Sequence, residues 1–433
     1  MTVSWTRWQE CADCGQRLGE LDRATSCPAC GRLLAVRFEA PPDAGSQLRA
    51  AFAERARTIG PSALTSGVWR YAELVASAAA DEIVTFPEGN TPLLTATAVA
   101  DWTGCDSLLL KHEGMNPTGS FKDRGMTVGV TQARRIGATA VACASTGNTS
   151  ASLAAYAARA GLPAIVLIPA GRVALGKLAQ TLSYGARTLA IRGDFDACLA
   201  LARGAADRLG LYLLNSVNPF RVEGQKTIVF ELLQQLDWSP PDWIALPAGN
   251  LGNLAAFGKA LDEAMAIGLV SKVPRLLAVQ ARGASPFYRS YRDRFAVRHV
   301  MEPETIATAI RIGDPASYAR GVVAIRRTNG AVVAVSDEEI MDGQAAIGRA
   351  GVGSEPASAA SVAGVRLAVS EGLIGDGESV VCVLTGHVLK DPGALLAYHR
   401  DADPAPACRN APIEIDASLS ALESQLAHVA GRT

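Results

Sequence analysis

From about residue 83 to about residue 400, short apolar runs rich in β-branched residues alternate with alanine-rich segments, and loops that carry glycine separate them. Examples are "ATAVACAST" before "NTSASLAAYAARAG", "LPAIVLIPA" before "GKLAQTLSYGA", and "DWIALPAGN" before "LAAFGKALDEAMAIG". Strand, turn and helix repeated in this way predict an α/β fold, with parallel sheets and helices on both faces. The loops at the carboxyl ends of such strands are where open α/β sheets bind ligands.

The composition excludes several classes of protein. The chain has 433 residues and a net charge of −1, so no overall field attracts nucleic acid or an anionic membrane. No apolar run near the start resembles a signal peptide, and none of about 18 residues could span a bilayer. Nine cysteines without such a signal indicate a reducing compartment. We therefore expect a cytoplasmic protein that binds neither nucleic acid nor membrane.

Two cysteine pairs mark the first forty residues as a separate module. Cys11-x-x-Cys14 and Cys27-x-x-Cys30 have the spacing of a tetrahedral four-cysteine zinc ribbon, and a glycine follows each pair. No histidine lies nearby to leave an open catalytic position, so we expect a structural zinc ion. Two redox-active pairs are the alternative, but the strand–helix–strand context of such pairs is missing. The other cysteines, predicted to be packing residues, are Cys105, Cys143, Cys198, Cys382 and Cys408.

Lys122, in "NPTGSFKDRG", is one of only seven lysines in a chain with 34 arginines. An arginine cannot lose its proton in a protein, whereas a partly desolvated lysine can, and the neutral amine is a nucleophile. The alternative is an ordinary helix start, capped by Thr118 or Ser120 and favoured by Asp123. That alternative does not account for a cation at the amino end of a helix. A carbonyl partner for the Lys122 amine is therefore the hypothesis.

Three more loops have the chemistry that one cofactor would need. "ASTGNTSAS" opens a helix with hydroxyls and N–H groups that suit an anion. "PAGNLGN" offers glycines and asparagines whose backbone N–H groups can turn toward a phosphate. Thr385 ends a strand with a hydroxyl that could meet a ring nitrogen. Each loop alone has an ordinary interpretation as a cap or a turn, but together with an imine-forming lysine they predict pyridoxal phosphate.

The chain resembles the threonine synthases among the fold-type II, tryptophan synthase β-like pyridoxal-phosphate enzymes. The resemblance covers roughly residues 60 to 395. Its motifs are "SGVWRY", "EGNTPL", "KHEGMNPTGSFKDRG", "ASTGNTSAS", "NSVNPFRVEGQKT", "PAGNLGN", "TAIRIGDPAS", "EPASAAS" and "TGHVLKDP". It implies two open twisted sheets flanked by helices, in three layers. It also implies a lyase that converts O-phospho-L-homoserine and water to L-threonine and phosphate.

The resemblance also implies residue roles. Lys122 joins the cofactor covalently, Asn148 bonds its 3′-oxygen, and Thr385 meets its pyridine nitrogen. The cofactor phosphate is held by Gly249, Asn250, Leu251, Gly252 and Asn253. The substrate carboxylate is held by the loop of Ser145, Thr146 and Thr149. The substrate phosphate is held by Ser216, Asn218 and Arg221, with Lys111 or Asn250. For Arg221 the alternative is a surface arginine or a structural ion pair with Glu223.

Domain organisation follows from the same analysis. We predict a zinc-ribbon-like module over 1–40, a catalytic body over 41–400 and a tail over 401–433 with a short final helix. A smaller subdomain of about 120–215 is inserted in the body. A homodimer is expected by resemblance.

Two departures and two other functions stay open. Gly353 and Ser354 stand where relatives usually carry bulkier residues, and Val388 where glycine is usual, so a phosphoserine-type substrate is an alternative. A related enzyme that replaces or eliminates at the β-carbon, such as a serine/threonine dehydratase or a cysteate synthase, is the second hypothesis. A third is a zinc-ribbon adaptor with an inactive body, which the near-neutral charge and the intact lysine loop disfavour.

Overall fold

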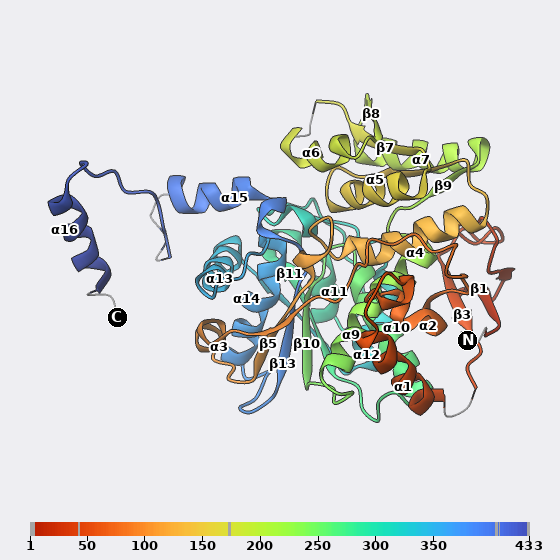
Figure 1. Cartoon of the computed structure of the whole chain (residues 1–433), viewed down its shortest axis with the longest axis horizontal. Coiled ribbons are helices and arrows are strands. Elements are labelled where there is room, and N and C mark those ends of the chain that lie inside the picture. Colours follow the sequence, from red (N-terminus) through yellow and green to blue (C-terminus); the bar gives the residue numbers. More distant parts are fainter. Residues whose placement is uncertain (1–4, 42–43, 172–174, 403–405, 407, 431–433) are drawn as a thin grey trace.

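Three β-sheets organise the chain in the computed structural model (Figure 1). The structure describes residues 5–41, 44–171, 175–402, 406 and 408–430. The strands are β1 (Arg7–Cys11), β2 (Arg17–Gly19), β3 (Leu34–Phe38), β4 (Leu93–Thr95), β5 (Leu108–His112), β6 (Ala140–Ala144), β7 (Ala164–Pro169), β8 (Arg187–Ile191), β9 (Leu211–Leu213), β10 (Trp243–Pro247), β11 (Arg275–Ala281), β12 (Ala331–Val335) and β13 (Val380–Leu384). The predicted α/β fold with two open sheets and helices around them is confirmed.

The helices fall between these strands as the alternating pattern predicts. They are α1 (Ala44–Arg57), α2 (Ala72–Val75), α3 (Thr97–Thr103), α4 (Lys122–Arg135), α5 (Asn148–Ala160), α6 (Leu175–Ser183), α7 (Phe195–Leu209), α8 (Pro219–Gln225), α9 (Thr227–Gln235), α10 (Gly252–Ala266), α11 (Pro286–Arg292), α12 (Tyr318–Arg327), α13 (Asp337–Arg349), α14 (Pro356–Ser370), α15 (Pro392–Leu396) and α16 (Leu419–Ala430). In the described part of the chain, no helix is both long and apolar enough to cross a membrane.

The larger sheet has the strand order β12-β11-β10-β13-β5-β4, parallel except for the edge strand β4. All five residues of β10 are buried. Because successive side chains point to opposite sides of a strand, both faces of the sheet are covered. In β10, Ile244 and Leu246 pack with α9, α10 and α12, whereas Trp243 and Ala245 pack with α14. The sheet therefore lies between two helical layers, and the carboxyl ends of its parallel strands meet at one edge.

The smaller sheet has the order β8-β7-β6-β9, and all its pairs are parallel. One face packs against α4 and α5, and the other packs against α7. In β6, Cys143 faces the first of these layers and Ala144 faces the second. These strands fall inside the predicted smaller subdomain, although its boundaries stay a prediction.

The first residues form a small antiparallel sheet of order β2-β1-β3 beside the body. At the other end, α16 lies apart from the body in Figure 1, at the blue end of the chain. Its leucines Leu419, Leu422 and Leu426 are exposed. Residues 1–4 of the predicted module and residues 403–405, 407 and 431–433 of the predicted tail lie outside the described residues.

A buried ion-pair network ties α4 to the larger sheet. Arg124 contacts Glu113, which follows β5, with Nε–Oε2 and Nη2–Oε1 distances of 2.7 and 2.8 Å. It also contacts Glu231 of α9, with Nη2 2.8 Å from Oε1, and Lys111 Nζ lies 2.6 Å from the same oxygen. Burial alone would raise the pKa of both carboxyls, but Arg124 and Lys111 hold them below their usual range. The network fixes the first turn of α4, where Lys122 lies.

Glycines let α4 and α8 approach backbone to backbone. A Cβ on Gly224 would overlap the carbonyl oxygen of Arg124, and one on Gly125 would lie 2.9 Å from the carbonyl oxygen of Arg221. The close approach brings the start of α4 against the helix that carries Arg221.

We expect Gly224→Ala to lower the thermal unfolding midpoint and the free energy of unfolding by about 2 kcal/mol or more, because the new methyl group overpacks this contact. The matched control is Gly204→Ala on α7, where an added Cβ meets no atom within 4 Å. The control should stabilise the protein by about 0.5–1 kcal/mol, since alanine favours a helix interior. Equal midpoints for the two variants would contradict the contact.

Candidate active site

The loop before Lys122 is held against the loop that follows β13. Phe121 N donates to Thr385 O at 3.0 Å, and His387 N donates to Gly119 O at 2.9 Å. This short antiparallel pairing brings two of the four predicted loops together at the ends of β13 and β5. Lys122 is therefore fixed at the carboxyl edge of the larger sheet, where α/β folds bind ligands.

The amine of Lys122 is poised to lose its proton. Burial and, to a lesser extent, the charge of Arg221 lower the pKa of Lys122 to about 7, although Glu355 opposes the shift. Within the described residues its Nζ has no hydrogen-bond partner, and it lies 4.3 Å from the centre of the Phe121 ring. A large fraction of this amine is neutral near pH 7, as the hypothesis of a nucleophilic lysine requires.

The alternative of an ordinary helix cap does not describe this helix start. Phe121 is the N-cap residue of α4, and no side chain caps the helix. Thr118 instead donates from Oγ1 to the buried carboxylate of Asp123 at 2.6 Å, and Ser152 donates to the same oxygen at 2.6 Å. Ser120 Oγ is buried without a partner among the described residues. Asp123 thus fixes the turn before Lys122.

Arg221 is a buried cation whose hydrogen bonds are incomplete. Only 1% of its surface is exposed, and Nη1 donates to Leu214 O at 3.1 Å. Its Nε and Nη2 have no partner in the part of the chain that the structure describes. Burial lowers the pKa of Arg221 to about 10, so it stays charged at neutral pH. The alternative for Arg221, an ion pair with Glu223, does not occur, because that carboxylate binds Lys226 and Lys259. A buried guanidinium with free donors is suited to an anionic ligand.

The glycine loop at 249–253 is shaped by close contacts. A Cβ on Gly249 would lie 2.8 Å from Ile310 Cα, and Leu251 has a left-handed backbone with φ of 60°. Asn250 Nδ2 donates to Ser216 Oγ at 2.6 Å, which joins this loop to the segment before α8. Both amide atoms of buried Asn253 have no partner among the described residues. The loop therefore carries polar groups that a bound phosphate could satisfy.

The loop that opens α5 is open to a ligand. Ser145, Thr146 and Thr149 are half-buried, and the first N–H groups of a helix have no partner within it. Asn148 Nδ2 donates to the carboxylate of Glu355 at 3.1 and 3.3 Å. This bond crosses from the smaller sheet's helix α5 to the larger sheet's helix α14.

Thr385 lies at the end of β13 and is 5% exposed. Its hydroxyl lies 3.1 Å from Ser358 Oγ, which also accepts from Gly386 N at 2.9 Å. Ser358 therefore orients the hydroxyl predicted to meet the ring nitrogen.

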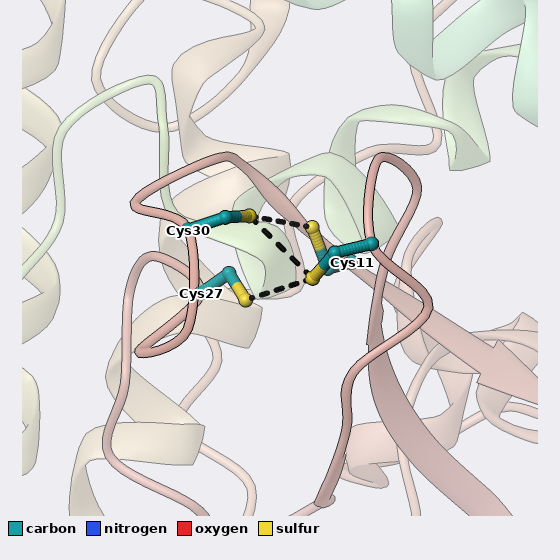
Figure 2. A group of neighbouring side chains, drawn as sticks. Cys11, Cys27 and Cys30 are labelled. Atoms are coloured by element: carbon teal, nitrogen blue, oxygen red, sulfur yellow. Dashed lines mark hydrogen bonds between the residues drawn. The ribbon is translucent and has the colours of Figure 1, made fainter.

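The four cysteines of the first module meet at one point. The sulfurs of Cys11, Cys14, Cys27 and Cys30 all lie within 4.8 Å of one another, and three pairs are 3.5 Å apart. Figure 2 shows Cys27 and Cys30 facing Cys11, which comes from a separate part of the module. Four sulfurs around a tetrahedral zinc ion would be about 3.8 Å apart, whereas a disulfide would require about 2.05 Å. The thiols are free.

Comparisons with known proteins show the family of this chain. The pattern that describes pyridoxal-phosphate dependent enzymes matches residues 84–386. A threonine synthase of Methanosarcina acetivorans is 45% identical over 96% of this chain and 98% of its own length. One of Mycobacterium bovis is 51% identical over 75% of this chain and 88% of its own. The chain belongs to the threonine synthase family of pyridoxal-phosphate-dependent enzymes.

The crystal structure of threonine synthase from Escherichia coli has the same fold. The two structures superpose with a TM-score of 0.71 over 98% of this chain and 100% of that chain, although only 21% of the residues are identical. The resemblance noted in the sequence is thereby confirmed for the family and the fold.

The residues present fit pyridoxal phosphate. A lysine with a lowered pKa, a buried asparagine whose amide has no partner among the described residues, and a hydroxyl at a strand end lie around one edge of the larger sheet. The side chain of Gln225 lies between α4 and the glycine loop, because a Cβ on Gly125 would lie 3.2 Å from its Nε2 and one on Gly252 would lie 3.9 Å from its Oε1.

Two residues predicted to bind the substrate phosphate, Lys111 and Asn218, form hydrogen bonds within the protein instead. Lys111 donates to Thr91 O, Glu231 and Gln235 at 2.7, 2.6 and 2.8 Å, so its three donors are used and its side chain is buried. Asn218 is the N-cap of α8: its oxygen accepts from backbone N–H groups, and its Nδ2 donates to Leu213 O. These contacts do not support the roles predicted for Lys111 and Asn218.

One residue near the centre was missed. In the sequence Glu355 is only the first residue of "EPASAAS", where an acid before proline is typical of a helix cap. The structure places it as the N-cap of α14, but its side chain makes no capping bond and turns toward Asn148 instead. The pairing across 207 residues leaves no local signal in the sequence.

The two departures from the family pattern touch each other. A Cβ on Gly353 would lie 2.9 Å from Val388 Cγ1, so the valine occupies space that the glycine leaves free. Ser354 forms an isolated bridge with His387 beside them. The small residue at 353 therefore makes room for the larger one at 388, near the loop of Thr385.

The pKa of Lys122 gives a test in the cofactor-free chain. The rate at which pyridoxal phosphate labels Lys122, trapped by borohydride and measured by mass spectrometry, should rise with pH and level off above about pH 7. Arg221→Met should move this midpoint to higher pH, because removing a nearby cation favours the protonated amine. Lys272→Ala, at an exposed position, is the control and should leave the midpoint unchanged. A midpoint near that of an ordinary lysine would refute the perturbed amine.

Proposed function

We propose that the chain is a threonine synthase that converts O-phospho-L-homoserine and water to L-threonine and phosphate. The observation that carries the proposal is that a lysine able to lose its proton, Lys122, occurs together with the buried cation Arg221. Nε and Nη2 of Arg221 have no partner among the described residues. A lysine alone would suit any member of the wider enzyme class, whereas the buried guanidinium suits a phosphorylated substrate.

The cofactor would be held by three parts of the chain. Lys122 would join its aldehyde carbon, and the loop of Gly249, Asn250, Leu251, Gly252 and Asn253 would hold its phosphate. Asn148 would donate to its 3′-oxygen, and the hydroxyl of Thr385 would meet its ring nitrogen. The free amide of Asn253 and the orientation of Thr385 by Ser358 support this assignment. When bound, pyridoxal phosphate supplies an electron sink for a carbanion.

The substrate would lie between two anion sites. The half-buried loop of Ser145, Thr146 and Thr149 would bind its carboxylate through hydroxyls and helix N–H groups. Arg221 would bind its phosphate through Nε and Nη2, with Ser216 and Asn250 beside it. With its two ends held in this way, the carbon chain of the substrate would lie near Lys122.

Lys122 Nζ would move the protons. With a pKa of about 7 it can accept a proton from a substrate carbon and return it to another at neutral pH. Arg221 would stabilise the negative charge of the departing phosphate, and its own proton stays in place because its pKa remains about 10. Net addition of water then completes the conversion.

The decisive experiment measures phosphate release from O-phospho-L-homoserine and from phosphoserine, with the amino-acid product identified by chromatography. We expect release from the first substrate with threonine as product. Lys122→Ala should abolish both the visible absorbance of the bound cofactor and turnover. Preferred release from phosphoserine, or β-elimination without threonine, would refute the proposed substrate and favour a related enzyme.

We also propose that the four cysteines hold a structural zinc ion. The turns after each pair support this: Gly15 N donates to Cys11 O at 3.0 Å, and Gly31 N donates to Cys27 O at 2.8 Å. The module contacts the far end of α4, where Arg23 donates to Ile136 O at 2.7 Å. The zinc would therefore stabilise the module that packs against the helix of Lys122.

Metal analysis should find about one zinc ion per chain, since four thiolates complete a tetrahedral site. Cys14→Ser should lose the ion and lower the thermal unfolding midpoint. Cys408→Ser changes a half-buried cysteine outside the cluster and should keep the metal content. Unchanged zinc in Cys14→Ser would contradict the site.

The homodimer, the cytoplasmic location and the domain boundaries stay proposals. Support for the boundaries is that β3 ends at Phe38 and that the smaller sheet lies within Ala140–Leu213.

A further inference from the structure

Glu355 is a buried carboxylate that the proposed reaction has not used. It is 3% exposed, and its backbone N donates to Gly386 O at 2.9 Å. A Cβ on Gly386 would overlap its carboxylate, so the absence of a side chain there leaves room for this group. The carboxylate is thus wedged beside Thr385, the residue proposed to meet the ring nitrogen.

The same carboxylate reaches the other side of the site. Both of its oxygens accept from Asn148 Nδ2, at 3.1 and 3.3 Å. An ionised carboxylate can only accept, so it decides which end of the Asn148 amide faces it. Nδ2 carries two N–H groups, so one can face Glu355 while the other faces the 3′-oxygen of the cofactor.

The charges around this carboxylate come from two further segments. Lys122 of α4 acts on it electrostatically, and so do Lys390 and Asp391, which follow β13. Burial raises the pKa of Glu355, while the Asn148 bond and the charges of Lys390 and Lys122 oppose the rise. In turn Glu355 raises the pKa of Lys122.

We propose that Glu355 is a positioning residue: its ionised carboxylate orients the Asn148 amide toward the cofactor and balances the charge on the Lys122 nitrogen. The role spans the two sheets, because Asn148 begins α5 and Glu355 precedes α14. It rests on the proposed function, since it requires the cofactor to be bound at Lys122.

The test compares Glu355→Ala and Glu355→Gln in the full chain loaded with pyridoxal phosphate. Two quantities are measured: the dissociation constant of the cofactor, and the pH at which its visible absorbance is half changed. The control is Glu88→Gln, because Glu88 is also fully buried but accepts from Tyr156 Oη at 2.8 Å.

Glu355→Ala should weaken cofactor binding about tenfold, since Asn148 loses its charged partner. Glu355→Gln keeps an oxygen that can accept from Asn148, so its affinity should fall less. Both variants should shift the absorbance midpoint to lower pH, because a negative charge near the Lys122 nitrogen is removed. Glu88→Gln should change neither quantity.

Wild-type affinity in Glu355→Ala, or an unshifted midpoint in Glu355→Gln, would overturn the proposal. If Glu355→Ala does not fold, the midpoint of the isosteric glutamine variant decides. An unmutated chain that binds no cofactor would instead refute the proposed function, so the two failures are distinguishable.

Discussion

The contact on which the site depends is the fully buried pairing of Arg124 with Glu113 and Glu231. Two carboxylates and two cations, Arg124 and Lys111, neutralise one another inside the protein. Removing one member would leave a charge in an apolar interior, at a cost of about 3–5 kcal/mol. Because Arg124 follows Lys122 by two residues, the network fixes where the reactive amine stands relative to the strand ends.

Much of the fold was predictable because it depends on periodicity. Within "DWIALPAGN" the five residues Trp243–Pro247 are all apolar, as expected of a strand covered on both faces, and the structure has β10 there. The antiparallel direction of β4 was not predictable, since Leu93–Thr95 is only three residues long and carries no directional signal.

The candidate site was predictable where chemistry is local and not where partners are distant. Lys122 stood out because of its residue type and its loop. Lys111 and Asn218 were assigned to the substrate because they lie in the right motifs. Their actual partners are Glu231, which lies 120 residues away from Lys111, and the backbone around α8. Sequence spacing does not show which polar groups satisfy one another inside a fold.

The contact between Gly353 and Val388 limits how this region can change. Valine fits only while position 353 has no side chain, and removing the valine alone would leave an unfilled space beside the loop of Thr385. A side chain added at position 353 would crowd Val388, and a smaller residue at position 388 would lose packing. Either exchange by itself therefore lowers the stability. Redesign of this wall should therefore replace both positions in a single step.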